Sequence, residues 1–277
     1  MGNVLEESLF KKQMKRFDRI SDFSKEFLGV YCTSSVLGTS IFGIVGNYAR
    51  KRELSLEILR YPFQDTELWA FTFIKKGTIF LCVNSELPVC KQIFTVAHEL
   101  YHIRCYAEDI NPDTVRSGSI LESRVVDETA MTQEDLEANA FAGLLLMPDS
   151  SMREQISLYG INEDTIKVDD VLTLMEVFAI PYKAVVLRLY EGKVITEPKA
   201  CDLLKYNASY VSQRIELTGK AKRWQMNNAG MEYFGSLLNN LQFNADNELL
   251  TESREESDRK FLDELKSGFY KKCKEGV

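Results

Sequence analysis

Three residues within five positions can carry metal chemistry: His98, Glu99 and His102, in the pattern His-Glu-x-x-His. Side chains four positions apart share one face of a helix, so the two imidazoles can bind a single metal ion. Glu99 lies about 100° around that helix from His98, where its carboxylate can reach a water on the metal. This combination of residue types and spacing indicates a metal-dependent peptidase with two nitrogen ligands and a general base.

The chain contains only two histidines, and both lie in this motif. A motif without function would require two unrelated histidines to fall four residues apart beside a glutamate. A catalytic zinc usually has three protein ligands. The third ligand must therefore be a carboxylate, a cysteine or absent. Cys105 follows His102 by three residues, but it is a weak candidate because the motif already accounts for that helix face.

A second helix is predicted from Thr132, a suitable N-cap, to Met147, where Pro148 ends it. Glu137 shares a face of this helix with Phe141 and two leucines, and an acid on an apolar face needs a partner. A metal ion would be a good partner. Glu134 lies on nearly the same face, so the periodicity leaves both acids open as ligands. A first-turn acid that favours the helix dipole is the simpler interpretation, and it suits Glu134 better.

The elements before this helix are expected to form a small sheet that leads into the motif helix. Apolar spacing predicts a helix over residues 6–28, and a second helical segment is expected over 33–50. A strongly apolar strand at 79–83 follows a predicted turn at Lys76-Gly77, which indicates a hairpin. The other two strands are expected at 55–60 and 68–74, the motif helix at 89–106, and a long loop with a short helical piece at 107–131.

The motif Phe94-Thr-Val-Ala-His-Glu-Leu-Tyr-His102, followed by Glu137-Ala-Asn-Ala-Phe-Ala and Leu144-Leu-Leu-Met-Pro148, resembles the ImmA/IrrE family of zinc metallopeptidases. The resemblance implies an α+β, zincin-like core with one Zn²⁺ per chain. It implies His98, His102 and Glu137 as the metal ligands and Glu99 as the catalytic base, which decides against Glu134. It covers about residues 56–189. Tyr101 stands where the family most often has Gly, so its side chain either narrows the cleft or points away.

Three regions are expected from these patterns. They are an N-terminal helical segment (1–50), a metallopeptidase core with trailing helices (51–190), and a mostly helical C-terminal region of unknown role (191–277). Within the last region, residues 192–196 are interpreted as a strand and 252–274 as an amphipathic helix that packs on the body or binds a partner. Many relatives carry an N-terminal helix-turn-helix, but no such pattern is found here.

Composition narrows the class of protein. The formal net charge of −7 makes binding to nucleic acid by the whole surface improbable, and the short basic run at 220–224 is expected to be a solvated face. No apolar run is long enough to span a bilayer, and the N-terminus lacks a signal-peptide pattern. A cytoplasmic protein with six reduced cysteines is therefore expected.

The functional prediction is a zinc-dependent endopeptidase that cleaves a protein substrate, with a repressor or an antitoxin-like regulator implied by the resemblance. The alternative is a non-proteolytic binding module, in which the zincin scaffold sequesters a regulator without cutting it. A third possibility is a regulatory subunit that acts through its C-terminal helices. The sequence predicts neither the cleavage site nor the oligomeric state.

Overall fold

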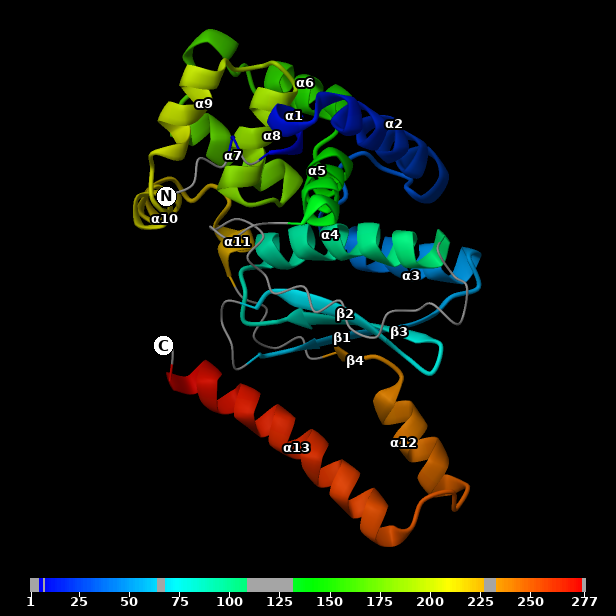
Figure 1. Cartoon of the computed structure of the whole chain (residues 1–277). Helices are drawn as coiled ribbons and strands as arrows, with labels where there is room; N and C mark the ends of the chain where they lie inside the picture. Colours follow the sequence, from blue (N-terminus) through cyan, green and yellow to red (C-terminus); the bar gives the residue numbers. More distant parts are fainter. Residues whose placement is uncertain (1–4, 7, 64–67, 109–131, 227–232, 276–277) are drawn as a thin grey trace.

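The computed structural model describes residues 5–6, 8–63, 68–108, 132–226 and 233–275. Its centre is a four-stranded sheet, and two helices, α3 and α4, cover one face of it (Figure 1). A lobe of helices lies beyond α4, and two further helices extend from the opposite side of the sheet (Figure 1). The predicted α+β class with a zincin-like core is confirmed.

The sheet has the strand order β2-β3-β1-β4. Its strands are β1 (Ser55–Tyr61), β2 (Ala70–Lys75), β3 (Thr78–Asn84) and β4 (Tyr233–Phe234). The predicted hairpin is confirmed, since β2 and β3 pair antiparallel around Lys76 and Gly77, both with positive φ as a tight hairpin turn requires. β1 pairs parallel to β3, so β2 lies at one edge of the described sheet.

The N-terminal region is helical, as expected. It contains α1 (Leu9–Lys12), α2 (Met14–Tyr31), a 3₁₀ turn (Gly38–Ser40) and α3 (Ile41–Lys51). The aromatic stripe of α2 turns inward, where Phe27 packs on Phe141 with ring centroids 5.7 Å apart. These helices share one continuous apolar core with the elements that follow them.

The motif helix is α4 (Val89–Glu108), and the next helix is α5 (Gln133–Leu146). They pack closely on each other, and α4 also packs on β2 and β3. α4 has completely buried apolar side chains such as Ile93, Val96 and Leu100. The histidine motif is therefore held between the sheet and α5. The loop predicted between the two helices, with its short helical piece, lies almost entirely outside the described residues.

The trailing helices are α6 (Asp149–Leu158), α7 (Val168–Phe178), α8 (Tyr182–Glu191), α9 (Glu197–Leu204), α10 (Ala208–Thr218) and the short α11 (Lys222–Gln225). A 3₁₀ turn, Glu163–Thr165, precedes α7. Residues 192–196 form a turn and not the predicted strand. The apolar pair Val194–Ile195 is buried because it closes the end of α8, with both amides donating to the Leu189 carbonyl.

The chain ends in a helical hairpin of α12 (Leu237–Asp246) and α13 (Glu252–Glu275). The predicted C-terminal helix is confirmed. β4 ties the hairpin to the sheet through two residue pairs with β1. Figure 1 shows both helices on the side of the sheet opposite α4. Among the described residues, no helix is long and apolar enough to cross a membrane.

Candidate metal centre

The two motif histidines are buried and face each other. His98 is 1% exposed and His102 is 2% exposed, and their Nε2 atoms lie 3.2 Å apart. Both side chains come from one face of α4, one turn apart, as the spacing predicts. The two imidazoles therefore converge on one point between α4 and α5.

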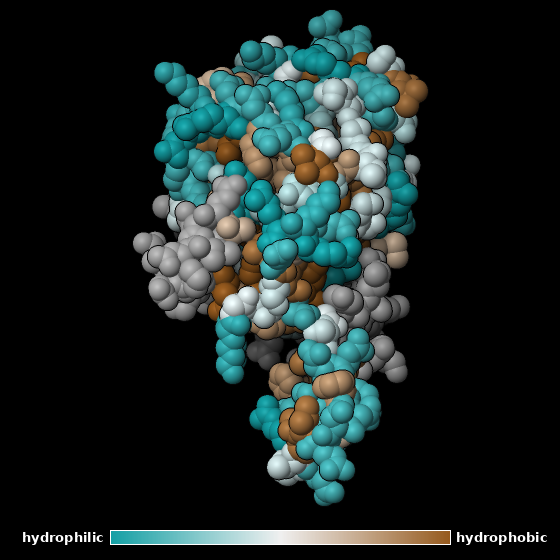
Figure 2. All heavy atoms as spheres, turned by 90° about the vertical axis from the view of Figure 1, so that its right-hand side faces the viewer, coloured by the Kyte–Doolittle hydropathy of each residue, from teal (hydrophilic) through white to brown (hydrophobic). Residues whose placement is uncertain are grey.

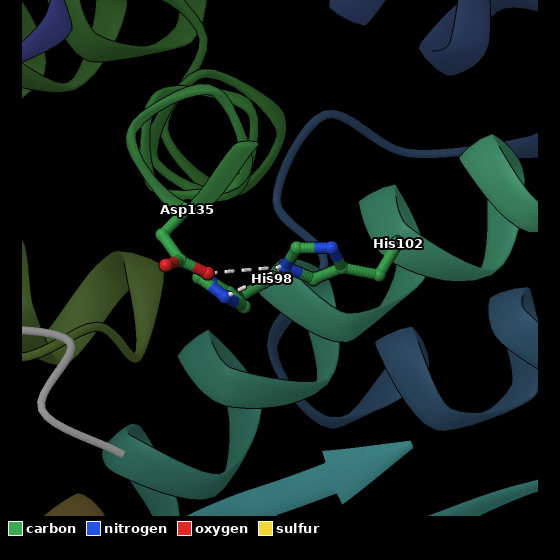
Figure 3. Close-up of side chains that lie close together, drawn as sticks. All are labelled: His98, His102 and Asp135. Atoms are coloured by element: carbon green, nitrogen blue, oxygen red, sulfur yellow. Dashed lines mark hydrogen bonds and ion pairs between the residues drawn. The ribbon is translucent and has the colours of Figure 1, made fainter. Parts of the chain in front are cut away.

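The carboxylate that reaches this point belongs to Asp135 in the first turn of α5. Its Oδ1 is 3.7 Å from His102 Nε2, and ligand atoms of His98, His102 and Asp135 all lie within 4.8 Å of one another. Figure 3 shows Asp135 descending from α5 towards the two rings on α4. Two imidazole nitrogens and one carboxylate form a donor set of the kind that holds catalytic zinc.

Local hydrogen bonds fix the Asp135 side chain. Thr132 is the N-cap of α5, and its amide and hydroxyl donate to Asp135 Oδ2 at 3.0 and 2.6 Å. The Asp135 amide donates in return to the Thr132 hydroxyl at 3.2 Å, which completes a capping box. Oδ2 is thus used by the cap, while Oδ1 faces the histidines.

A second group of side chains orients the imidazoles. His98 Nδ1 lies 2.8 Å from Asn139 Oδ1, and His102 Nδ1 lies 2.6 Å from Glu134 Oε1. Both acceptors come from α5, so each Nδ1–H donates to an oxygen and each Nε2 keeps its lone pair for a metal. Sequence reasoning left Glu134 as a dipole-favouring acid and did not identify Asn139 or Asp135.

The structure does not bring the predicted ligand Glu137 to this point. Its carboxylate accepts hydrogen bonds from the Tyr101 hydroxyl at 2.7 Å and from Arg16 Nη1 at 2.6 Å. Glu137 lies two residues from Asp135, about 200° around α5, so the two acids face different sides of the helix. The partner expected for an acid on this apolar face is present, but it is a tyrosine and an arginine.

Tyr101 itself belongs to the contact between the two helices. Its ring lies 5.6 Å from Phe141, and its side chain is buried. The hydrogen bond with Glu137 then joins α4 to α5, and Arg16 joins α2 to the same pair. The Tyr101 side chain therefore points towards α5.

Glu99 is buried beside the histidines and is held by the sheet. Its Oε2 accepts a hydrogen bond of 2.6 Å from the hydroxyl of Thr72, a buried residue of β2. Burial raises the pKa of Glu99 to about 7, with His102 and the Thr72 hydrogen bond acting in the opposite direction. A carboxylate with a pKa near neutrality is suited to take up and release a proton.

The pKa values of the two histidines are shifted in opposite directions. Burial, reinforced by His102, lowers the pKa of His98 to about 3, so its ring is neutral and can bind a metal. Burial alone would lower the pKa of His102, but the hydrogen bond with Glu134 and the charge of Glu99 raise it overall. The same hydrogen bond lowers the pKa of Glu134 and keeps it ionised.

The family model for the IrrE N-terminal-like domain, Peptidase_M78, matches residues 51–190. The chain belongs to this family. The match spans β1 to α8 and thus the sheet, the motif helix and the whole candidate metal centre. The resemblance drawn from the sequence is confirmed, and the protein has a metallopeptidase-type core. A search of curated proteins found no match to this chain.

Proposed function

We propose that this protein is a zinc-dependent endopeptidase in which His98, His102 and Asp135 hold one zinc ion. The observation that carries the proposal is the convergence of one ring nitrogen from each histidine and an Asp135 carboxylate oxygen within 4.8 Å. Asp135 takes the place that the sequence resemblance gave to Glu137. Asn139 and Glu134 support the assignment, because their hydrogen bonds leave both Nε2 atoms directed at the common point.

Glu99 is proposed as the general base. Zinc, when bound, supplies a Lewis acid that lowers the pKa of water to about 7 and polarises a carbonyl group. Glu99 takes a proton from the attacking water and delivers it to the leaving amine. Thr72 holds the Glu99 carboxylate in place through its hydroxyl, so the base does not have to be ordered during the reaction.

The edge strand β2 is the proposed docking position for the substrate. No strand of the described chain pairs with β2 on the side away from β3, and its Thr72 contacts the base. An extended polypeptide can add to such an edge through its backbone, which would bring a peptide bond beside Glu99. We therefore expect a protein substrate. The family resemblance gives a repressor or antitoxin-like regulator as the preferred class, and the cytoplasm is the location expected from the sequence.

The substitution Glu99→Gln tests the base. The variant should keep its zinc, since Glu99 is not a ligand, and lose cleavage of a protein substrate by about 10²–10⁴-fold. Glu154→Gln, at an exposed position of α6, is the matched control and should cleave normally. Cleavage at the wild-type rate by Glu99→Gln would rule out Glu99 as the base.

The alternative proposal is a binding module that sequesters a regulator without cutting it. It is favoured by the same free edge at β2, which can capture an extended segment without any chemistry. The two proposals differ in the fate of the partner. If Glu99→Gln still relieves repression and the partner stays intact with the wild type, the binding module is correct.

A further inference from the structure

The outer face of the sheet, on the side away from α4, carries a row of aromatic side chains. Side chains alternate along each strand, and Thr72 points to Glu99 on the α4 side, so Phe71 and Phe73 point outward. Register places Phe80 beside Phe73, with their rings stacked 4.8 Å apart. The outer face then continues through Phe71 to Phe63 and Tyr61, with ring centroids 5.0–6.0 Å apart.

This aromatic face stands apart from the main apolar core. Phe71, Phe73 and Phe80 are each only partly buried, and none belongs to the core cluster or to the side chains packed against it. The described helices that pack on the sheet, α3 and α4, lie on its other face (Figure 1). A continuous row of large aromatic side chains, unlike a single apolar residue at the surface, indicates an interaction site.

The C-terminal hairpin carries a second exposed apolar surface. Phe243 and Phe261 are 61% and 58% exposed, and Leu237, Leu238 and Leu249 are also exposed. Among its described side chains, Leu241 and Leu262 are the buried apolar ones. Figure 2 shows hydrophobic side chains on this protruding part and again at the base of the body above it. Among the described side chains of the two helices, two buried leucines are a small core, so the hairpin is expected to need further contacts.

The base of the hairpin is fixed to the sheet in a way that sets its direction. The amide of Ser236 donates to Glu57 Oε2 at 2.8 Å, and its hydroxyl donates to Glu57 Oε1. Gly235, with a φ of +57°, lies against the same carboxylate and leaves no room for a side chain. The hairpin and the partly buried aromatic face thus lie on the same side of the sheet (Figure 1), while Phe243 and Phe261 of the hairpin stay exposed.

We infer that this protein forms a two-fold symmetric dimer in which the hairpin of each copy covers the aromatic sheet face of the other. Each chain carries one of each surface, so a two-fold axis pairs both at once and leaves neither exposed. A different protein would need two complementary surfaces of its own to cover both. A second copy satisfies both surfaces with no further component.

Charge at the rims of the two surfaces supports the same pairing. Lys75 continues the outward row of Phe71 and Phe73, and Lys76 follows it in the turn between β2 and β3. Among the described residues, neither lysine forms an ion pair, and neither do Glu252, Glu256 and Asp263 of α13. Unpaired lysines beside one surface and unpaired acids beside the other favour a contact between the hairpin of one copy and the sheet of the other.

The test is sedimentation of the full chain over a dilution series. The wild type should sediment with twice the 31.8 kDa mass of one chain. The double variant Phe243→Asp, Phe261→Asp should raise the dissociation constant of the dimer at least about tenfold, because both anchors lie at the surface. The matched control is Leu158→Asp with Leu217→Asp, which changes two leucines of the helical lobe that are 71% and 76% exposed and should stay dimeric.

A mixing experiment tests the reciprocal contact. The sheet variant Phe73→Thr, Phe80→Thr should be monomeric alone, like the hairpin variant. Mixed together, the two should form a heterodimer, since one copy still has an intact sheet face and the other an intact hairpin. A wild type that is monomeric at every concentration would overturn the inference, and so would a hairpin variant as dimeric as the control. If the sheet variant does not fold, the hairpin variant alone decides.

Zinc content provides an independent check on folding. The aromatic face lies on the opposite side of the sheet from Glu99, so the hairpin variant should keep the same metal content as the wild type. A monomeric hairpin variant with unchanged zinc supports the dimer. Loss of both dimerisation and zinc would mean that the variant is misfolded. The less drastic double variant Phe243→Ser, Phe261→Ser then decides, again by its dimerisation at unchanged zinc content.

Discussion

At the residue scale, the candidate metal centre depends on which acid of α5 faces the histidines. Asp135 and Asn139 lie four residues apart, so a single face of α5 supplies one carboxylate and the oxygen that orients His98. Glu137 lies on the other side and binds Tyr101 and Arg16. Spacing from Asn139 was the signal in the sequence that could have selected Asp135. The apolar helix face left both Glu134 and Glu137 open, and the family resemblance favoured Glu137.

Removing the oxygens that orient the imidazoles should weaken zinc binding without abolishing it. Asn139→Ala and Glu134→Ala each leave one Nδ1–H without its acceptor, so the affinity for zinc should fall about 10–100-fold. Competition with a chromophoric chelator measures this change. Glu163→Ala, an exposed acid of the 3₁₀ turn, is the control. Unchanged affinity in both variants would show that these contacts do not tune the centre.

Glu137 has a different predicted role, which its own variant tests. Glu137→Ala removes the acceptor for Tyr101 and Arg16, so the contact between α2, α4 and α5 should weaken. We expect a loss of about 1–3 kcal/mol in the free energy of unfolding, measured by urea denaturation of the metal-free protein. Lys25→Ala, which removes an exposed ion pair with Asp22 on α2, should change stability little.

At the element scale, the helices behind α5 are locked by a buried arginine. Arg188 of α8 is 1% exposed; it donates to the Met147 carbonyl at the end of α5 and pairs with Asp149 and Glu191. Gly143 lies so close that an added Cβ would meet Arg188 Cδ at 2.9 Å. α8 therefore holds the C-terminal end of the helix that carries Asp135.

Arg188→Met should be strongly destabilising. The substitution leaves the Glu191 carboxylate buried without its cation, and broken buried pairs of this kind cost about 3–5 kcal/mol. Lys205→Met is the matched control, because its ion pair with Asp202 is 74% and 64% exposed and contributes little. Equal urea midpoints for the two variants would contradict the assigned role.

The connection from α7 to α8 has the short turn of a helix-turn-helix, with Ala179 in the left-handed region. A recognition helix needs exposed side chains to read a groove. No residue of α8 is fully exposed, and six of its ten are buried. The pair is therefore built as a packing unit of the helical lobe.

At the scale of the whole molecule, local patterns predicted more than long-range contacts. The hairpin at Lys76-Gly77 and the motif helix follow from turn chemistry and periodicity, which act over a few residues. Pairing of β4 with β1 joins residues about 175 positions apart, and no local pattern could indicate it. Val194 and Ile195 are β-branched residues of the kind found in strands. In the structure they are instead buried against the end of α8.

The most direct test of the central claim is zinc content per chain, measured by elemental analysis on the wild type, Asp135→Ala and Glu137→Ala. The proposed centre predicts about one zinc in the wild type, a sharp loss in Asp135→Ala and retention in Glu137→Ala. Loss of zinc from Glu137→Ala with retention in Asp135→Ala would restore the ligand set implied by the sequence. A folded wild type that takes up no zinc when it is supplied would contradict the metallopeptidase proposal itself.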